Sequence, residues 1–244
     1  MKFNIQCMKC ITEGIKDKNK VVQELTDDRV YHLTCNEGHE TVIIFEPHVY
    51  ELLFEMGLYA LIDGYAREAV ANFAAAIERF HEFSINVFAA KALQSISYME
   101  DFPTAWRELS KQTERQLGAF VMMYLITFKR SPKLMPQKKI EFRNDVIHKG
   151  KFPSISETTE YAKLTFEYIK NKLIEMKKEL SNEVSYVHDK NLRDYVIKHA
   201  GNGKHIVHWS ELVTFRSTRP LEEIEFMTFE ESLDNRKQYR SFYN

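Results

Sequence analysis

An arginine and a histidine with complementary chemistry stand near the middle of the chain, at Arg143 and His148, and Asn144 directly follows the arginine. The arginine side chain carries a planar fork of N–H donors that grips phosphate and stays charged. The histidine side chain titrates near neutral pH and can take up or release a proton. Together these residue types predict a site that holds a phosphate group and moves protons beside it.

The segment around this pair is strongly basic. Residues 129–151 contain eight lysines and arginines but only two acids, Glu141 and Asp145, which leaves a local excess of six positive charges. The whole chain has a formal net charge of -1, so its overall charge attracts no nucleic acid. A phosphate-bearing partner is therefore expected to bind at this segment.

These residue types meet the chemical needs of RNA cleavage. A base takes the proton of the 2′-hydroxyl, an acid protonates the leaving 5′-oxygen, and a cation stabilises the charged transition state, so no metal ion is needed. We expect Arg143 to bind the scissile phosphate and His148 to act as general base or acid. Asn144 is expected to orient the phosphate or His148. On an ideal helix Arg143 and His148 point about 140° apart. Either the arginine side chain bends around, or the helix frays before His148, or two copies of the motif meet in a dimer.

A structural interpretation of the same residues stays open. An arginine and a histidine at a helix end can bind the last carbonyl groups and interact with the helix dipole, and the lysines can form a solvated face. Glu78 and Arg79, on an earlier helix, either support the motif or form a salt bridge at the surface of the bundle.

A second group of residues has the spacing of a metal site. Cys7 and Cys10 are separated by two residues, and Cys35 and His39 by three. Zinc takes four sulfur and nitrogen ligands in a tetrahedron, and two tight turns that each present a pair of ligands build such a site. Four protein ligands leave no open position for catalysis, so we predict a structural zinc ion. The alternative is that the cysteines are ordinary thiols and His39 is a surface residue.

Composition and hydropathy restrict the class of protein. Three cysteines, an odd number, argue against a disulfide framework. No apolar run is long enough for a membrane span, and the N-terminus lacks the apolar core of a signal peptide. These features predict a cytoplasmic protein without a membrane partner.

The pattern along the chain predicts a mainly α fold in three parts. Residues 1–46 contain two β-favouring runs, Tyr31–Thr34 and Thr41–Phe45, and form a small zinc-ribbon-like β module. Residues 47–180 show helical periodicity and short connections, which indicate an antiparallel helical bundle. Residues 181–244 form an α/β extension with a helix near 183–199, a turn at 201–203 and a strand over 205–215. The expected helices of the bundle are His48–Asp63, Tyr65–Leu93, Pro103–Lys129, Gln137–His148 and Ile155–Leu180.

The motif resembles a known family. The run Arg143-Asn144-x-x-x-His148, placed late in a helical bundle, is similar to the arginine–histidine signature of HEPN-domain proteins. The segments Gly64–Val70 and Ile77–Phe80 resemble early helices of the same family. The resemblance covers residues 47–180, somewhat more than half of the chain. It implies a HEPN-like bundle whose catalytic residues are Arg143, Asn144 and His148.

This resemblance implies a function. Many HEPN-domain proteins are metal-independent endoribonucleases that act as toxins or in antiviral defence. They typically form homodimers, in which two motifs share one cleft, and an antitoxin or defence-system partner is possible. We therefore expect a hydrolase that binds RNA and cleaves it to 2′,3′-cyclic phosphate and 5′-hydroxyl ends. Two alternatives stay open: a non-catalytic RNA- or nucleotide-binding HEPN module, and a zinc-ribbon adaptor that regulates a partner protein.

Overall fold

The chain divides into two compact units in a computed structural model, which describes all residues except 1, 16–19, 94, 200–204, 210–212 and 242–244. The mixed unit consists of Met1–Pro47 and Asp189–Leu212, and the helical unit consists of His48–His188 and Val213–Asn244. The residues of the expected C-terminal extension, 181–244, are thus divided between both units. Most of the chain is helical, which confirms the expected mainly α class.

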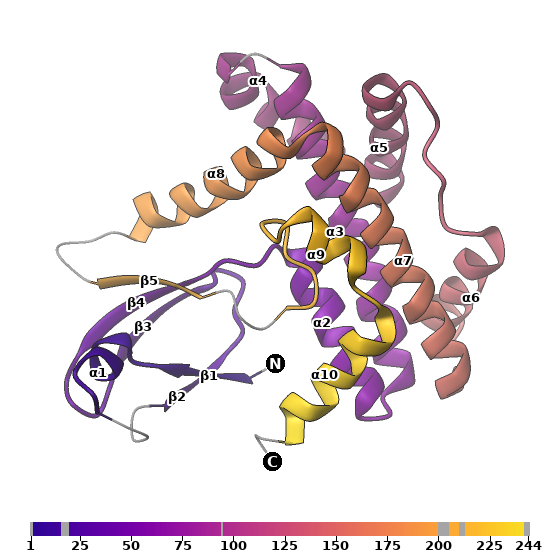
Figure 1. Cartoon of the computed structure of the whole chain (residues 1–244). Helices are drawn as coiled ribbons and strands as arrows, with labels where there is room; N and C mark the ends of the chain where they lie inside the picture. The colour runs from indigo at the N-terminus through magenta and orange to yellow at the C-terminus, as the bar shows by residue number, and fades with distance from the viewer. Residues whose placement is uncertain (1, 16–19, 94, 200–204, 210–212, 242–244) are drawn as a thin grey trace. The chain divides into compact units, whose positions relative to one another are not determined.

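The mixed unit contains two small sheets (Figure 1). Strand β1 (Lys2–Gln6) pairs antiparallel with β2 (Lys20–Glu24), and the short helix α1 (Met8–Thr12) lies between them in the chain. Strand β4 (Glu40–Phe45) is the centre of the second sheet, between antiparallel β3 (Val30–Thr34) and parallel β5 (His205–Trp209). The two β-favouring runs of the sequence are therefore confirmed as strands β3 and β4.

The central position of β4 explains its composition. Five consecutive residues of this strand, Thr41–Phe45, are buried, because a central strand is covered on both faces. Val42 and Ile44 cluster with Val30 of β3, and Leu192 and Val196 pack against this cluster. The last two residues belong to helix α8 (Ser181–His199), which confirms the helix expected near 183–199.

The expected strand over 205–215 is confirmed at His205–Trp209 and is wrong at 213–215. Residues 210–212, like the expected turn at 201–203, lie outside the described residues, and Val213 to Phe215 are not in a strand. Instead, the backbone N–H and the hydroxyl of Thr214 donate to the carboxylate of Glu55 at 2.8 and 3.0 Å. A buried side-chain acceptor therefore replaces the strand partner in this segment.

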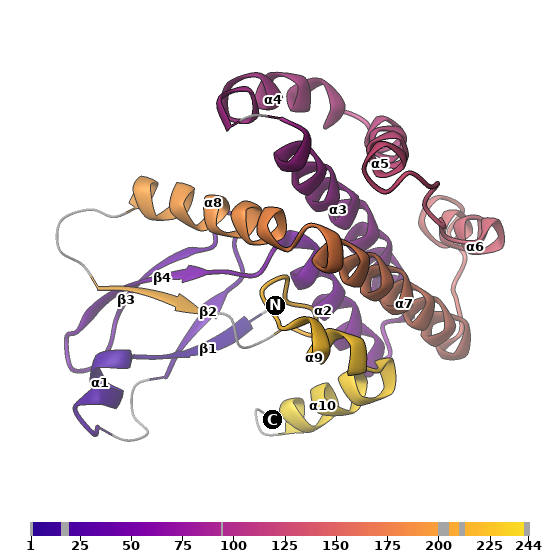
Figure 2. The ribbon, with the colours of Figure 1, turned by 45° about the horizontal axis from the view of Figure 1, so that its top comes forward.

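The helical unit is built around one long helix, α3 (Ala66–Ala92) (Figure 2). This helix contacts α2 (Val49–Ile62), α5 (Thr113–Phe128), α6 (Gln137–His148) and α7 (Ile155–Glu179). Four helices match their expected ranges to within one residue at each end, and Gly64 and Gly150 follow helix ends with positive φ, as expected of C-terminal glycines. Ser154 and Glu157 form a capping box at the N-terminal end of the helix that begins at Ile155. The four matching helices are α2 (Val49–Ile62), α3, α6 (Gln137–His148) and α7 (Ile155–Glu179).

The helix expected over 103–129 is wrong, because two helices occupy this region: α4 (Ser95–Leu109) and α5 (Thr113–Phe128). Pro103 lies inside α4 rather than at a helix start. The rings of Tyr98, Phe102 and Trp106 stack at successive centroid distances of 5.4 and 6.1 Å, which favours a helix on both sides of the proline.

The acidic C-terminal region folds onto the helical unit as α9 (Leu221–Phe226) and α10 (Phe229–Ser241). Two buried glutamates of α2 hold the segment before these helices. The backbone N–H of Ser217 donates to Glu51 at 2.8 Å, and Glu55 forms an ion pair with Arg236 of α10. Burial raises the pKa of Glu51 to about 7. Within the described part of the chain, no helix is both long and apolar enough to cross a membrane.

At Gly57, helix α2 packs closely against a side chain of α3. A Cβ atom at this position would lie 2.6 Å from the ring of Phe73. The ring of Phe73 is itself fully buried and packs against Phe54 at a centroid distance of 5.1 Å. Glycine inside a helix lowers its intrinsic stability, but here the missing side chain lets the two helices pack.

Gly57→Ala should therefore destabilise the protein. Alanine gains about 1 kcal/mol of helix propensity over glycine, but overpacking against the Phe73 ring costs about 1–3 kcal/mol. Gly118→Ala is the matched control, since Gly118 lies in α5 with open space around it and should gain up to about 1 kcal/mol. Denaturant unfolding followed by circular dichroism measures both changes, and equal stabilisation of the two variants would contradict the close helix approach.

Candidate metal centre and the Arg143–His148 helix

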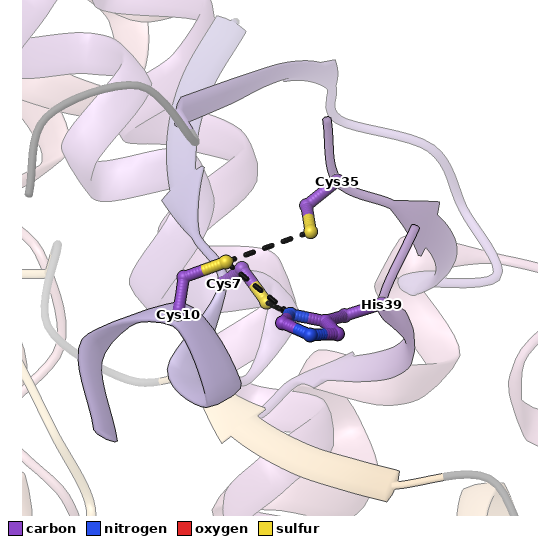
Figure 3. A group of neighbouring side chains, drawn as sticks. All are labelled: Cys7, Cys10, Cys35 and His39. Carbon is purple, nitrogen blue, oxygen red and sulfur yellow. Dashed lines mark hydrogen bonds between the residues drawn. The ribbon is translucent and has the colours of Figure 1, made fainter. Parts of the chain in front are cut away.

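Two tight turns bring together the three cysteines and His39 (Figure 3). Cys7 directly precedes α1 and Cys10 lies inside it, so the first turn of this helix presents one pair. Cys35 and His39 flank the turn between β3 and β4, where the N–H of Cys35 donates to the carbonyl of His39 at 3.1 Å. Gly38, with φ of 79°, supplies the left-handed conformation that closes this turn.

The distances in this group match a tetrahedral zinc site. With Zn–S near 2.3 Å and Zn–N near 2.0 Å, a tetrahedron places ligand sulfurs about 3.8 Å apart and sulfur and nitrogen about 3.5 Å apart. The Sγ atoms of Cys10 and Cys35 are 3.6 Å apart, and His39 Nδ1 lies 3.3 Å from Cys10 Sγ and 3.8 Å from Cys7 Sγ. All four ligand atoms lie within 4.8 Å of one another, so the residues fit a zinc ion.

The environment of the sulfurs also favours a cation. The three cysteines are free thiols, and each side chain is buried. Burial and the neighbouring thiols raise the pKa of Cys10 to about 12. Burial acts in the same direction on Cys35, but the backbone N–H groups of His39 and Glu37 outweigh it and lower the pKa of this thiol. Zinc stabilises thiolates that cannot otherwise form side by side, and four protein ligands close its coordination sphere.

Arg143 lies on α6 and is held on two sides. Its Nη2 atom forms an ion pair with Oε1 of Glu78 on α3, and its Nη1 atom donates to Asn144 Oδ1 at 2.9 Å. The Arg143 side chain remains 26% exposed. The neighbouring Arg79 points elsewhere, since it contacts Glu82 and Gln116. Of the two α3 residues considered from the sequence, Glu78 therefore reaches the motif and Arg79 does not.

His148 is the last residue of α6 and is exposed. The N–H of Lys149 still donates to the carbonyl of Asp145 at 3.1 Å, so the helix does not fray before His148. Among the described residues, none forms a hydrogen bond with the His148 side chain or links it to Arg143. The two side chains consequently leave α6 in directions about 140° apart.

The basic segment is largely neutralised by acids from other elements. Five of its eight cations form ion pairs with carboxylates. Four of these carboxylates lie outside residues 129–151, so counting them reduces the local excess from six positive charges to two. The pairs are Arg130–Glu175, Lys139–Glu160, Arg143–Glu78, Lys149–Asp145 and Lys151–Glu157.

Sequence reasoning considered Glu78 but missed the other three outside carboxylates and one further group. The four outside carboxylates come from α3 and α7, and a count within the segment does not include residues that folding brings near. Glu13, which lies beside His39, is the other omission. Its only signal in the sequence is its position three residues after Cys10, on the same side of a helical turn.

Comparison with protein-family models, with curated proteins and with solved structures found no match to this chain. The likeness to HEPN-domain proteins therefore stays a prediction from the motif and its setting.

The ligand set predicts one zinc ion per chain, held by three sulfurs and one nitrogen. Metal analysis of the purified protein should find this stoichiometry, and His39→Ala should lower it. His148→Ala is the matched control, because it removes a histidine outside the cluster. Loss of the ion should also speed amide hydrogen exchange in β3 and β4, since the metal closes the turn between them. Protein without zinc, or equal zinc in both variants, would contradict this centre.

Proposed function

We propose that the protein is a metal-independent endoribonuclease that binds RNA at α6 and cleaves it to 2′,3′-cyclic phosphate and 5′-hydroxyl ends. Arg143, Asn144 and His148 are the proposed catalytic residues. The observation that carries this proposal is the anchored guanidinium of Arg143, which Glu78 and Asn144 hold in place while leaving it partly exposed. An exposed histidine lies on the same helix.

The anchored arginine keeps donors for a ligand. A guanidinium group has five N–H donors, and the contacts to Glu78 and Asn144 engage one on each terminal nitrogen. The remaining donors can grip a phosphate in the bidentate manner that arginine favours. Because Glu78 offsets the charge of Arg143, directed hydrogen bonds rather than net charge support this role.

The proposed reaction needs one base and one acid. His148 takes the proton from the 2′-hydroxyl, and this oxygen attacks the adjacent phosphorus as the bond to the 5′-oxygen breaks. A protonated histidine gives its proton to the leaving oxygen, and Arg143 stabilises the charge on the phosphoryl oxygens. Since α6 stays helical to its end, Arg143 and His148 of one chain do not share a helix face. A homodimer in which one chain's Arg143 meets the other chain's His148 supplies both groups.

Phe152 provides a surface for an unpaired base. It lies four residues after His148 and is 88% exposed, with Lys149 and Lys151 beside it in the chain. Exposed aromatic rings bind single-stranded nucleic acid because unpaired bases stack on them. We therefore propose single-stranded RNA as the substrate class.

The proposed biological role is that of a toxin or phage-defence effector. An endoribonuclease of this kind damages the RNA of its own cell unless it is restrained. An antitoxin or defence-system partner protein is accordingly part of the proposal, as is action in the cytoplasm, where RNA is reached.

A second candidate function is non-catalytic, and the ion pairs of the basic segment favour it. On this view the Arg143–Glu78 pair links α6 to α3, and the protein is an RNA- or nucleotide-binding module or a zinc-ribbon adaptor that regulates a partner. The two functions differ in what removing His148 changes. A catalytic site loses cleavage, whereas a binding module has no cleavage to lose and an adaptor depends on the cysteines.

Removal of His148 should abolish most of the cleavage activity. General acid–base groups contribute about 10²–10⁴-fold to rate, so His148→Ala should slow RNA cleavage by about this factor. Arg143→Lys keeps the charge but loses the fork, and it should also lower the rate. Arg79→Ala is the matched control, because Arg79 pairs away from the motif.

The assay uses single-stranded RNA in EDTA with mapping of the product ends. The zinc content of the same samples is measured, because EDTA competes for the metal centre. Cleavage by wild type with cyclic phosphate ends, and its loss in His148→Ala, is the expected result. Undiminished cleavage by His148→Ala, or a requirement for added Mg²⁺, would overturn the proposed mechanism.

Phe152→Ala should weaken the binding of single-stranded RNA. Stacking on an aromatic side chain contributes about 1–3 kcal/mol per base, and Phe152→Tyr should preserve it. Phe226→Ala is the matched control, since Phe226 is 81% exposed on α9 and has no basic neighbour in sequence. Fluorescence anisotropy of a labelled RNA measures the affinities. Equal losses at both phenylalanines would argue against a base-binding role for Phe152.

A further inference from the structure

The two ring nitrogens of His39 face different partners. Nδ1 points into the sulfur cluster, 3.3 Å from Cys10 Sγ (Figure 3). Nε2 lies 3.4 Å from Oε2 of Glu13 on the other side of the ring. The His39 side chain is only 15% exposed, and the Glu13 side chain is 43% exposed. The histidine is thus placed between the candidate metal position and a carboxylate.

This arrangement matches the chemical need of a histidine that binds a metal. A metal ion takes the lone pair of one ring nitrogen, so the proton must reside on the other nitrogen. With Nδ1 facing the sulfurs, the proton belongs on Nε2. A carboxylate that accepts this N–H holds the ring in one tautomer and one orientation, and it makes the metal-facing nitrogen more basic.

We propose that Glu13 is the outer-shell partner of this metal centre and positions His39 for zinc. The proposal rests on the candidate metal centre and is independent of RNA cleavage. Glu13 does not contact the metal in this proposal but acts through the His39 ring. The 3.4 Å separation of Nε2 and Oε2 is within ion-pair range, and the partly exposed Glu13 side chain has the rotamer freedom to shorten it.

The local backbone explains why Glu13 is available at this place. The N–H of Ile15 donates to the carbonyl of Cys10 at 2.9 Å, and the N–H of Gly14 donates to Ile11 at 3.1 Å. Gly14 has φ of 73°. These two bonds and a left-handed glycine are the Schellman motif that ends a helix. The motif fixes the backbone of Glu13 relative to Cys10, which is a ligand from the same helix.

The side chain that follows the motif strengthens this link. Ile15 packs against the cluster of Cys7, Cys10 and Cys35. A hydrophobic contact after the glycine is a usual part of the Schellman motif, and here its partner is the ligand set itself. The turn that carries Glu13 is therefore anchored to the metal centre at both ends.

The test compares the zinc affinity of four proteins by competition with a chromophoric chelator. Loss of an outer-shell partner typically lowers metal affinity about 10–100-fold, so Glu13→Ala should bind Zn²⁺ more weakly than wild type by this factor. Glu37→Ala is the matched control, because it removes an equal charge from the turn that carries His39. Among the described residues, the Glu37 side chain forms no hydrogen bond or ion pair with the His39 ring. Glu13→Gln keeps an acceptor oxygen and should recover part of the affinity.

A double-variant cycle separates the contact through the His39 ring from the charge of Glu13. A cysteine at position 39 has no ring N–H to donate to Glu13, so Glu13→Ala should have a much smaller effect on zinc affinity in the His39→Cys background. The visible absorption of bound Co²⁺ confirms that wild type and Glu13→Ala keep the same ligands. Equal losses from Glu13→Ala in both backgrounds, or equal losses from Glu13→Ala and Glu37→Ala, would overturn the proposal.

Zinc binding by wild type tests the metal centre, whereas the difference between wild type and Glu13→Ala tests the role of Glu13. Wild type that binds no Zn²⁺ would overturn the metal centre and the role of Glu13 together. Tight binding by wild type and Glu13→Ala alike would overturn only the role of Glu13. Neither result changes the RNA-cleavage assay, which tests different residues.

Discussion

The burial of α3 is the constraint on which the helical unit depends. Fourteen of its residues are buried, and a single neighbouring helix, which covers only one face, cannot bury them all. Helices α2, α5, α6 and α7 all pack on it. The same helix carries Phe73, which requires a glycine on α2, and Glu78, which holds Arg143 on α6. Core packing and the candidate catalytic residue are therefore set by one element.

The mixed unit needs a different source of stability, because its apolar core is small. Its two clusters are the sulfur group and a few aliphatic residues around β4. Small folds of this kind usually need a metal or a disulfide in place of core volume. The three cysteines and His39, from two turns, have the geometry to hold a metal ion that provides this link. From a distant part of the chain, β5 adds a strand beside β4, and Leu192 and Val196 of α8 pack against the aliphatic cluster.

Ion pairs formed on folding reduce the positive charge that residues 129–151 present to a ligand. A sequence count treats the eight basic residues as a field that attracts phosphate. In the folded chain most of them face carboxylates of α3, α6 and α7, and a paired charge exerts little field at a distance. What remains at Arg143 is a guanidinium of fixed orientation with free donors. Recognition at such a site depends on the geometry of the guanidinium group rather than on net charge.

Local signals determined the helix boundaries and the ligand set of this protein. The capping box at Ser154, the glycines at 64 and 150, and the paired spacing of the cysteines each act within a few residues, so they can be interpreted without the fold. The start of α4 before Pro103 was missed because stacked rings keep a helix on both sides of this proline.

Only the tertiary structure decided which distant residues meet. It paired Glu78 with Arg143, placed Glu13 beside His39, added β5 to the N-terminal sheet and gave Thr214 a glutamate instead of a strand partner. The physical reason is that a contact between side chains depends on how whole elements pack. The pattern of apolar and polar residues in the sequence indicates which face of a helix or strand is buried, but not which element packs against that face.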